Sequence, residues 1–92
     1  MKLFSGTAPA AGATHNIPNH GGRTFAPVQS SSATSCTVEI QGRMGKDQPW
    51  QVLKTLTDDD ADTVAIFPQM RANVTAVTGQ CEVDIWVLGT PL

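Results

Sequence analysis

The sequence predicts an all-β protein, a small antiparallel β-sandwich of the jelly-roll type that carries a long extended N-terminal arm. From residue 35 onward, apolar and polar residues alternate in short runs separated by turn residues, which is the period of half-buried strands. Residues 1–34 are instead dense in Gly, Ala, Pro, Ser and Thr and show neither a helical nor a strand period. We therefore expect an arm over 1–34 and a sandwich domain over 35–92.

The expected arm contains no acidic residue and only Lys2 and Arg23 as fixed charges. Such a segment buries too little apolar area to offset the entropy lost on ordering, so we expect it to be mobile until it meets another surface. Deleting residues 1–28 should then leave a folded sandwich. Contacts with a neighbouring subunit are expected from apolar and basic side chains, namely Leu3, Phe4, Ile17, Arg23, Phe25, Val28 and, from the sandwich, Arg71.

Five strands are expected in the sandwich, over residues 35–42, 50–56, 63–67, 70–77 and 81–88. The alternation is clearest in the last strand, where Cys81, Val83 and Ile85 occupy one face. A short helix over 50–57 is the competing interpretation of the second strand, because Val52 and Leu56 also fit a helical stripe. The side chains expected in the core are Cys36, Val38, Ile40, Val52, Val64, Ile66, Val74, Val83, Ile85 and Val87.

Charge is sparse throughout the chain, and this disfavours several classes of function. Asp, Glu, Lys and Arg make up 15% of the residues, well below the roughly 25% of an average soluble domain, and the net charge is −2. This balance disfavours nucleic acid as a partner. No apolar run approaches the roughly 20 residues that a membrane helix needs, and no signal peptide is apparent. We expect a soluble protein, made in the cytoplasm, with no membrane partner.

A sandwich of this size has a thin core and exposed sheet edges. Below roughly 70 residues one core seldom supplies enough stability alone, and unpaired edge strands offer backbone groups to other chains. We therefore expect neighbours to complete the protein, as a homo-oligomer, a dimer or a trimer, within a larger assembly.

Cys36 and Cys81 fall on the inward faces of the first and last expected strands. A free cysteine behaves as a small buried hydrophobe, and a cytoplasmic chain stays reduced, which favours two buried thiols. A disulfide between them is the alternative if the two strands are neighbours. The acidic surroundings disfavour a catalytic thiol.

Two groups of residues match metal-binding patterns only in part. His15 and His20 are five positions apart, a spacing that fits no standard zinc pattern, and no Cys or carboxylate lies near them in the sequence. Asp58, Asp60 and Asp62 have the spacing of the first half of a calcium loop, but the glycine and the bidentate glutamate that should follow are missing. We expect polar arm residues, a solvated acidic turn, and no metal or other cofactor.

Trp50 and Trp86 could stack on a sugar if both were exposed on one face. Core or interface packing is the more frequent position of a tryptophan in a strand. The sequence shows no Ser-His-Asp arrangement, paired carboxylate site or phosphate loop. We therefore expect a protein that is not an enzyme, and a glycan-binding module is an alternative to a structural role.

Four segments of the chain resemble small virion proteins of tailed bacteriophages. They are TVEIQG at 37–42, QPWQVL at 48–53, FPQMRANVT at 67–75 and VDIWV at 83–87, and the likeness covers roughly residues 35–88. The resemblance implies a capsid cement or decoration protein, located in the virion. Such a protein binds the outer face of the head and bridges neighbouring subunits of the major capsid protein. Another virion component, from the tail or the fibre base, is the second expectation.

Overall fold

The computed structural model describes residues 1–17, 24–87 and 90–91, and these residues form ten strands and no helix. The strands are β1 (Lys2–Gly6), β2 (Ala10–Ala11), β3 (His15–Asn16), β4 (Phe25–Ser32), β5 (Ser35–Arg43), β6 (Gln51–Thr57), β7 (Asp60–Ala65), β8 (Gln69–Thr78), β9 (Cys81–Val87) and β10 (Thr90–Pro91). The expected all-β fold is confirmed. Within the described ranges, no helix of the length and apolarity needed to cross a membrane occurs.

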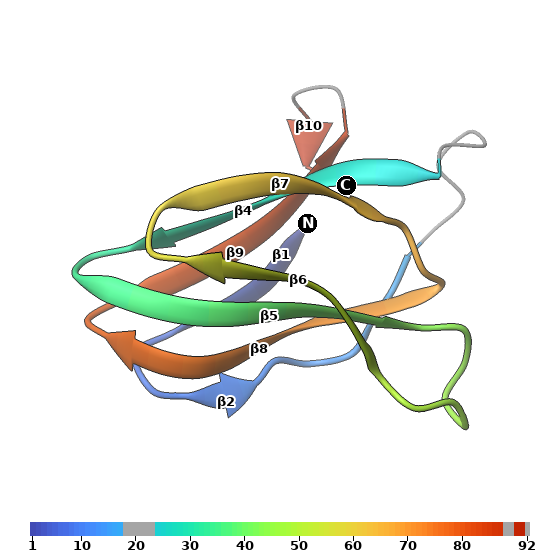
Figure 1. The fold of residues 1–92 in the computed structure, drawn as a ribbon, viewed down its shortest axis with the longest axis horizontal. Helices are drawn as coiled ribbons and strands as arrows, with labels where there is room; N and C mark the ends of the chain where they lie inside the picture. The colour runs from blue at the N-terminus through green and yellow to red at the C-terminus, as the bar shows by residue number, and fades with distance from the viewer. Residues whose placement is uncertain (18–23, 88–89, 92) are drawn as a thin grey trace.

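The strands form two antiparallel sheets of five strands each (Figure 1). The first sheet has the order β1-β9-β4-β7, with β10 also paired to β9, and the second has the order β2-β8-β5-β6, with β3 also paired to β8. The chain passes from the second sheet to the first at tight turns that contain Asp58 and Gly79, whose φ angles are 56° and 79°. Asp and Gly tolerate this left-handed conformation better than most residues, which fixes where the chain turns.

Both sheets contribute side chains to one core. Alternate residues along each strand point into it, as the strand period requires. The buried hydrophobic residues are Leu3, Ala26, Val28, Cys36, Val38, Ile40, Leu56, Val64, Met70, Ala72, Val74, Cys81, Val83 and Ile85. Burying a Val, Leu, Ile or Met side chain contributes about 1.5–3 kcal/mol, so this core is the main source of stability.

The N-terminal segment does not form the free arm that the sequence led us to expect. β1 pairs with β9, β2 and β3 pair with β8, and β4 lies between β9 and β7 inside the first sheet. Leu3 and Val28, which were expected at a neighbouring subunit, are 2% and 0% exposed in the chain's own core. These strands pair backbone groups of β8 and β9, and they bury apolar surface, which together offset the entropy lost on ordering.

The other expected arm contacts are also placed differently. Phe4 and Ile17 are half-buried and pack against the chain's own core. Phe25 is 62% exposed at the start of β4, on the outer side of the first sheet. Arg23 lies outside the described residues. Arg71 is half-buried in β8 and belongs to the candidate site below.

Four of the five expected strands, over 35–42, 50–56, 70–77 and 81–88, occur as β5, β6, β8 and β9, although residue 88 lies outside the described residues. β7 begins earlier than expected, at Asp60, and the alternative helix over 50–57 is wrong because β6 pairs with β5. Val52 is not in the core but 53% exposed, because a register shift between Ile40 and Gln41 turns it outward.

The remaining expected core residues are buried, with two exceptions. Ile66 is half-buried and packs against the core from outside the strands. The side chain of Val87 lies outside the described part of the structure. The alternation of apolar and polar residues therefore predicted the inward faces of β5 and β9 correctly, and that of β8 as far as Val74. Beyond it a register shift leaves Ala76 exposed and packs Val77 against the core.

Candidate functional site

The outer face of the second sheet carries a ladder of polar side chains along β5 and β8. Three residue pairs lie directly opposite one another across these strands, and a side-chain hydrogen bond joins each pair. Asn73 Nδ2 donates to Glu39 Oε1 at 3.0 Å, Arg71 Nε donates to Gln41 Oε1 at 2.7 Å, and Arg43 Nε donates to Gln69 Oε1 at 2.7 Å. The ladder faces outward because the residues between its members, such as Ile40 and Ala72, are buried in the core.

Two further hydrogen bonds connect members of the ladder to each other and to β3. Gln41 Nε2 donates to Glu39 Oε1 at 3.1 Å, and Gln69 Nε2 donates to Asn16 Oδ1 at 3.0 Å. Gln41 is only 7% exposed. A buried amide whose oxygen and nitrogen both have partners is held in one orientation, so Gln41 in turn fixes the position of Arg71.

Trp50, which directly precedes β6, contacts both arginines of the ladder. The guanidinium carbon Cζ of Arg43 lies 4.2 Å from the centre of the indole ring, and that of Arg71 lies 4.4 Å from it. Both distances are within the range of a cation–π contact, about 6 Å. We call Arg43, Trp50 and Arg71 the Arg–Trp cluster. Each guanidinium group in it is held by an indole contact and by an Nε hydrogen bond.

Neither Arg43 nor Arg71 forms an ion pair with a carboxylate of the described residues, where the ion pairs involve Lys2 and Lys54. Glu39, the acid of the ladder, instead accepts hydrogen bonds from two side-chain amides. The terminal nitrogens of both guanidinium groups therefore carry N–H donors that no carboxylate of the described chain satisfies. Arginine keeps its charge at every physiological pH, so these donors are always present.

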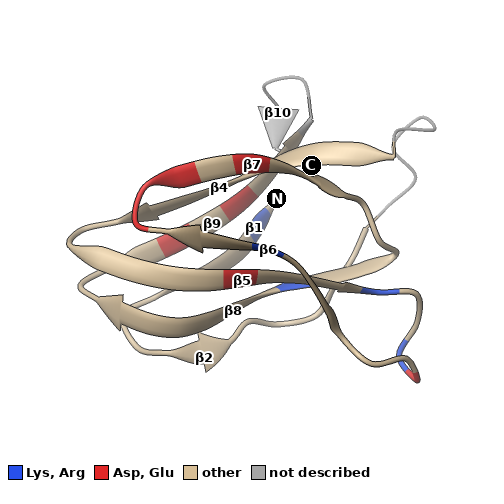
Figure 2. Ribbon diagram, viewed as in Figure 1, with Lys and Arg blue, Asp and Glu red and all other residues tan. Residues whose placement is uncertain are grey.

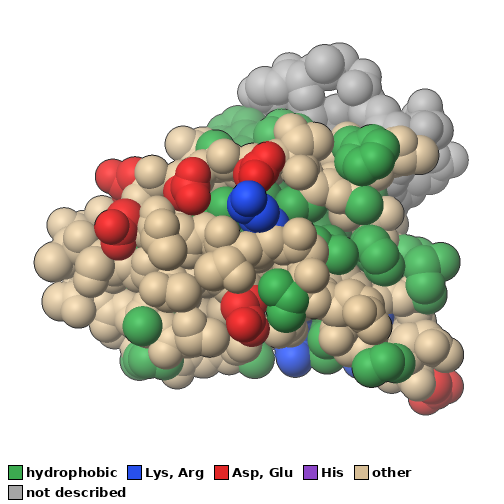
Figure 3. Space-filling view, in the orientation of Figure 1, with side chains coloured by type: hydrophobic (Ala, Val, Ile, Leu, Met, Phe, Trp, Pro, Cys, Tyr) green, Lys and Arg blue, Asp and Glu red, His purple; other side chains and the backbone are tan. Residues whose placement is uncertain are grey.

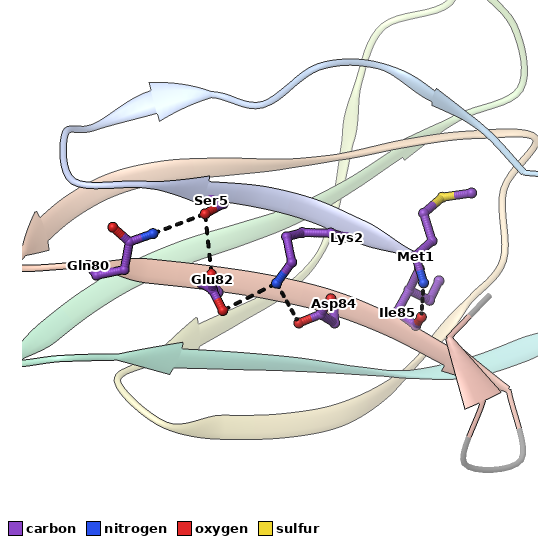
Figure 4. Close-up of polar contacts among 7 residues, drawn as sticks. All are labelled: Met1, Lys2, Ser5, Gln80, Glu82, Asp84 and Ile85. Atoms are coloured by element: carbon purple, nitrogen blue, oxygen red, sulfur yellow. Dashed lines mark hydrogen bonds and ion pairs between the residues drawn. The ribbon is translucent and has the colours of Figure 1, made fainter.

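The outer face of the first sheet differs, because two of its carboxylates share one lysine as their ion-pair partner (Figure 4). Lys2 Nζ lies 3.2 Å from Glu82 Oε2 and 3.4 Å from Asp84 Oδ2. Ser5 Oγ donates to Glu82 Oε1 at 3.3 Å, and Gln80 Nε2 donates to Ser5 Oγ at 2.9 Å (Figure 4). These contacts connect β1 to β9, and as exposed ion pairs they contribute little to stability.

The carboxylates in and after the acidic turn between β6 and β7 hold it to neighbouring strands. Asp58 and Asp59 each accept a hydrogen bond at Oδ1 from a backbone N–H group, at 3.1 and 2.8 Å. Asp62 Oδ2 lies 2.9 Å from Lys54 Nζ, and this hydrogen-bonded pair joins the two sheets. The contact lowers the pKa of Asp62 and raises the pKa of Lys54. Across the described ranges, no three His, Cys, Asp or Glu side chains gather in a metal-binding arrangement.

Charge and apolar surface are unevenly distributed over the molecule. Figure 2 shows acidic residues along β7 and on β9, and basic residues at the end of β5, on β8 and in the loop after β5. In Figure 3, exposed hydrophobic side chains gather on the side of the molecule where this loop lies. Two of the exposed residues adjoin the Arg–Trp cluster: Met44, 67% exposed, follows Arg43, and Val52, 53% exposed, lies opposite Gln41. The cluster therefore has apolar side chains at its border.

Cys36 of β5 and Cys81 of β9 are free thiols buried in the core, as expected, and they are not joined by a disulfide. Cys36 Sγ donates to the carbonyl oxygen of Asp58 at 3.5 Å. Burial, followed by contact with the Cys36 thiol, raises the pKa of Cys81 to about 12. A thiol with this pKa stays protonated at neutral pH, which removes the nucleophile that catalysis would need from Cys81.

Trp50 and Trp86 do not lie on one face, so the possibility that both stack on one sugar is wrong. Trp86 follows the buried Ile85 in β9 and so lies on the outer side of the first sheet, whereas Trp50 lies over the second sheet. His15 lies in β3 opposite Met70, and His20 lies outside the described residues. A shallow depression of about 350 Å³ runs beside β1 and is lined by Lys2, Leu3, Phe4, Ser5, Gly12 and Ala13, none of which belongs to the Arg–Trp cluster.

Sequence inspection identified Arg71 as a contact residue but missed its partners. Gln41 is an outward position of the expected strand over 35–42, whereas Arg43 and Gln69 fall in connections outside the expected strands. The available signal was the strand period itself, which places alternating Glu, Gln and Arg on the outside of one strand and Gln, Arg and Asn on the outside of another. The period does not predict the register between the two strands, and this register brings the residues into opposite pairs.

Comparison with known proteins identifies no relative. No protein-family model matches the chain, and searches of curated proteins and of solved structures found no match. The case for a function therefore rests on the strand order and on the Arg–Trp cluster.

Proposed function

We propose that the two sheets form a β-sandwich of the jelly-roll type. The pairing supports this because it is nested: β5 pairs with β6, β4 with β7, β2 and β3 with β8, and β1 with β9. Rolling one long antiparallel hairpin gives this order and places alternate strand pairs in opposite sheets, as in a jelly roll. Jelly rolls occur in viral capsid and lectin domains, so the fold favours assembly or binding without deciding between them.

We infer further that the protein is a virion structural protein, a cement or decoration protein on the outer face of a tailed-phage head. The Arg–Trp cluster is the observation that carries this proposal. Trp, Arg and Met are enriched at protein–protein interfaces, and Trp and Arg dominate their binding energy. Here Trp50 contacts both arginines on one sheet face, and the exposed Met44 directly follows Arg43 in the chain. The proposal agrees with the expectation of a phage virion protein that the four segments between residues 35 and 88 suggested.

The mechanism of such a protein is mechanical. Each copy buries part of the second sheet against neighbouring subunits of the major capsid protein and bridges them. Because the copy binds the assembled lattice and not free subunits, it shifts the equilibrium toward the intact shell, and many copies multiply a modest contact. The chain acts without a cofactor in this role, and a dimer or trimer of it on the lattice would strengthen the bridge.

The test measures binding of the purified chain to heads that lack it, by co-sedimentation. Trp50→Ala should reduce head occupancy at least about tenfold, as truncation of a central aromatic does at an interface. Phe25→Ala is the matched control, because Phe25 is an exposed aromatic on the outer side of the first sheet. It should leave occupancy unchanged.

Equal binding by wild type and Trp50→Ala would refute the second sheet as the docking face. Binding to tails but not heads would favour a tail or fibre-base component. Binding to neither, with quenching of tryptophan fluorescence by sugars, would favour a glycan-binding module.

A further inference from the structure

The Arg–Trp cluster has the donors of an oxyanion site. Arg43 and Arg71 use Nε to bond Gln69 and Gln41, and their planes are held over Trp50. This leaves the terminal N–H groups, which match a carboxylate through two parallel hydrogen bonds. Because both side chains are half-buried, such bonds are less screened there than on an open surface.

Most of the chain's own carboxylates are already engaged elsewhere. Seven of its eight acidic residues hold a hydrogen bond or an ion pair, and Asp47 is the remaining one. The seven are Glu39 in the ladder, Asp58, Asp59 and Asp60 on backbone N–H groups, Asp62 with Lys54, and Glu82 and Asp84 with Lys2. The acid that complements the two arginines is therefore best supplied by another molecule.

We propose that the Arg–Trp cluster binds carboxylate side chains on an acidic segment of a partner protein. Arg43 and Arg71 donate their terminal N–H groups to Asp or Glu side chains of that segment. The exposed Met44 and Val52 at the border suit apolar residues next to those acids. The inference rests on the proposed function for the identity of the partner, which would be the major capsid protein.

The experiment titrates the full chain with a hexaglutamate peptide and follows the Nε–Hε resonances of Arg43 and Arg71 by NMR. Hexaglutamine is the neutral control peptide. Both arginine resonances should shift with hexaglutamate and not with hexaglutamine. The double variant Arg43→Gln/Arg71→Gln should bind the peptide at least about tenfold more weakly, the loss expected for charge-assisted hydrogen bonds.

Two variants separate the effect of the planar guanidinium geometry on peptide binding from the effect of positive charge. Lys46→Gln removes one positive charge from the loop after β5 and should change peptide affinity less than twofold, since Lys46 lies outside the ladder. Arg43→Lys/Arg71→Lys keeps the charge but lacks the planar fork, and it should weaken binding by at least about threefold. Circular dichroism and a melting curve check that each variant is folded.

Four results would overturn the inference: no shift at millimolar hexaglutamate, equal binding of hexaglutamine, an equal loss in Lys46→Gln, or binding of inorganic phosphate as tight as that of the peptide. Self-association of the wild type that Arg43→Gln/Arg71→Gln abolishes would make a second copy the occupant and overturn it also. Head binding that survives the double variant would refute the inference alone. Peptide binding by a chain that does not bind heads would refute the proposed function alone.

Discussion

Arg71 shows how neighbouring side chains define the role of one residue. It is half-buried with no carboxylate partner in the described chain, and Gln41 and Trp50 hold it by a hydrogen bond of 2.7 Å and a ring contact of 4.4 Å. A lysine in this place would keep the charge but lose the planar group that bonds and stacks at the same time. The geometry of the guanidinium group, more than its charge, makes the position specific.

The buried thiol of Cys81 predicts a specific dependence of stability on pH. The pKa of Cys81 is raised from 9.0 to about 12 in the folded protein. Between these values the unfolded chain loses the thiol proton and the folded chain keeps it, so stability falls as pH rises, by up to about 1.4 kcal/mol per pH unit. Below pH 9 the group has no effect.

Urea unfolding of wild type and Cys81→Ala from pH 8 to 11 measures this effect. The variant is less stable at pH 8, because it leaves a cavity, but its stability should fall less steeply above pH 9. Parallel curves for the two proteins would show that Cys81 titrates normally in the folded state.

The strands illustrate which parts of this fold its sequence predicts. β5, β8 and β9 alternate apolar residues with polar ones, so most of their inward-facing residues can be predicted from the sequence. β2 and β3 have two residues each and form through pairing with β8, which no local pattern reveals. β4 buries Ala26, Val28 and Ser30, and its small residues together with Pro27 hide the alternation.

Pro27 lies where β4 pairs with β7 alone, because pairing with β9 begins at Val28. A proline lacks the N–H group that pairing on both sides would require, so this position is one of the few that accept it in β4. Sequence reasoning that treats proline as a sign of loop structure misses such a strand.

Gly12 provides a test of whether the N-terminal strands belong to the fold. An alanine Cβ there would lie 2.8 Å from the carbonyl oxygens of both Ala72 and Leu3, and backbone atoms cannot move aside easily. Gly12→Ala should therefore destabilise the protein by about 1–3 kcal/mol, the usual cost of overpacking.

Gly45→Ala is the matched control, because an added Cβ at Gly45 would meet no atom within 4 Å. It should change the unfolding free energy by less than about 0.5 kcal/mol. Equal stability of the two variants in urea unfolding would show that the segment around Gly12 is not packed between β1 and β8.

At the scale of the whole molecule, residues from both ends of the chain complete the same sheets. β1 pairs with β9 and β4 pairs with both β7 and β9, so the segment before residue 35 is part of the first sheet. Deleting residues 1–28 should consequently abolish cooperative folding, because it removes Leu3, Ala26 and Val28 from the core. Circular dichroism and thermal melting measure this. A truncated chain that melts cooperatively near the wild-type temperature would contradict this prediction and support a free arm.

The strand order of the whole molecule also explains how much of the ladder and the Arg–Trp cluster could be predicted from the sequence. Each outward residue of the ladder is visible in its own strand, yet β5 and β8 are separated by β6 and β7 in the chain. Their pairing and register arise from the nested winding of all the strands, and only that winding places Gln41 opposite Arg71 and leaves Trp50 beside them. A site built across distant strands therefore follows from the whole fold rather than from any motif.

Location and copy number in the particle test the central claim most directly. A lysate of the source is separated on a density gradient, and the copies of this protein per particle are counted by mass spectrometry. A cement protein should migrate with DNA-filled heads in hundreds of copies, because it occupies sites repeated over the lattice. Recovery as a free small oligomer, or in a few copies that follow the tails, would contradict the proposed role on the head.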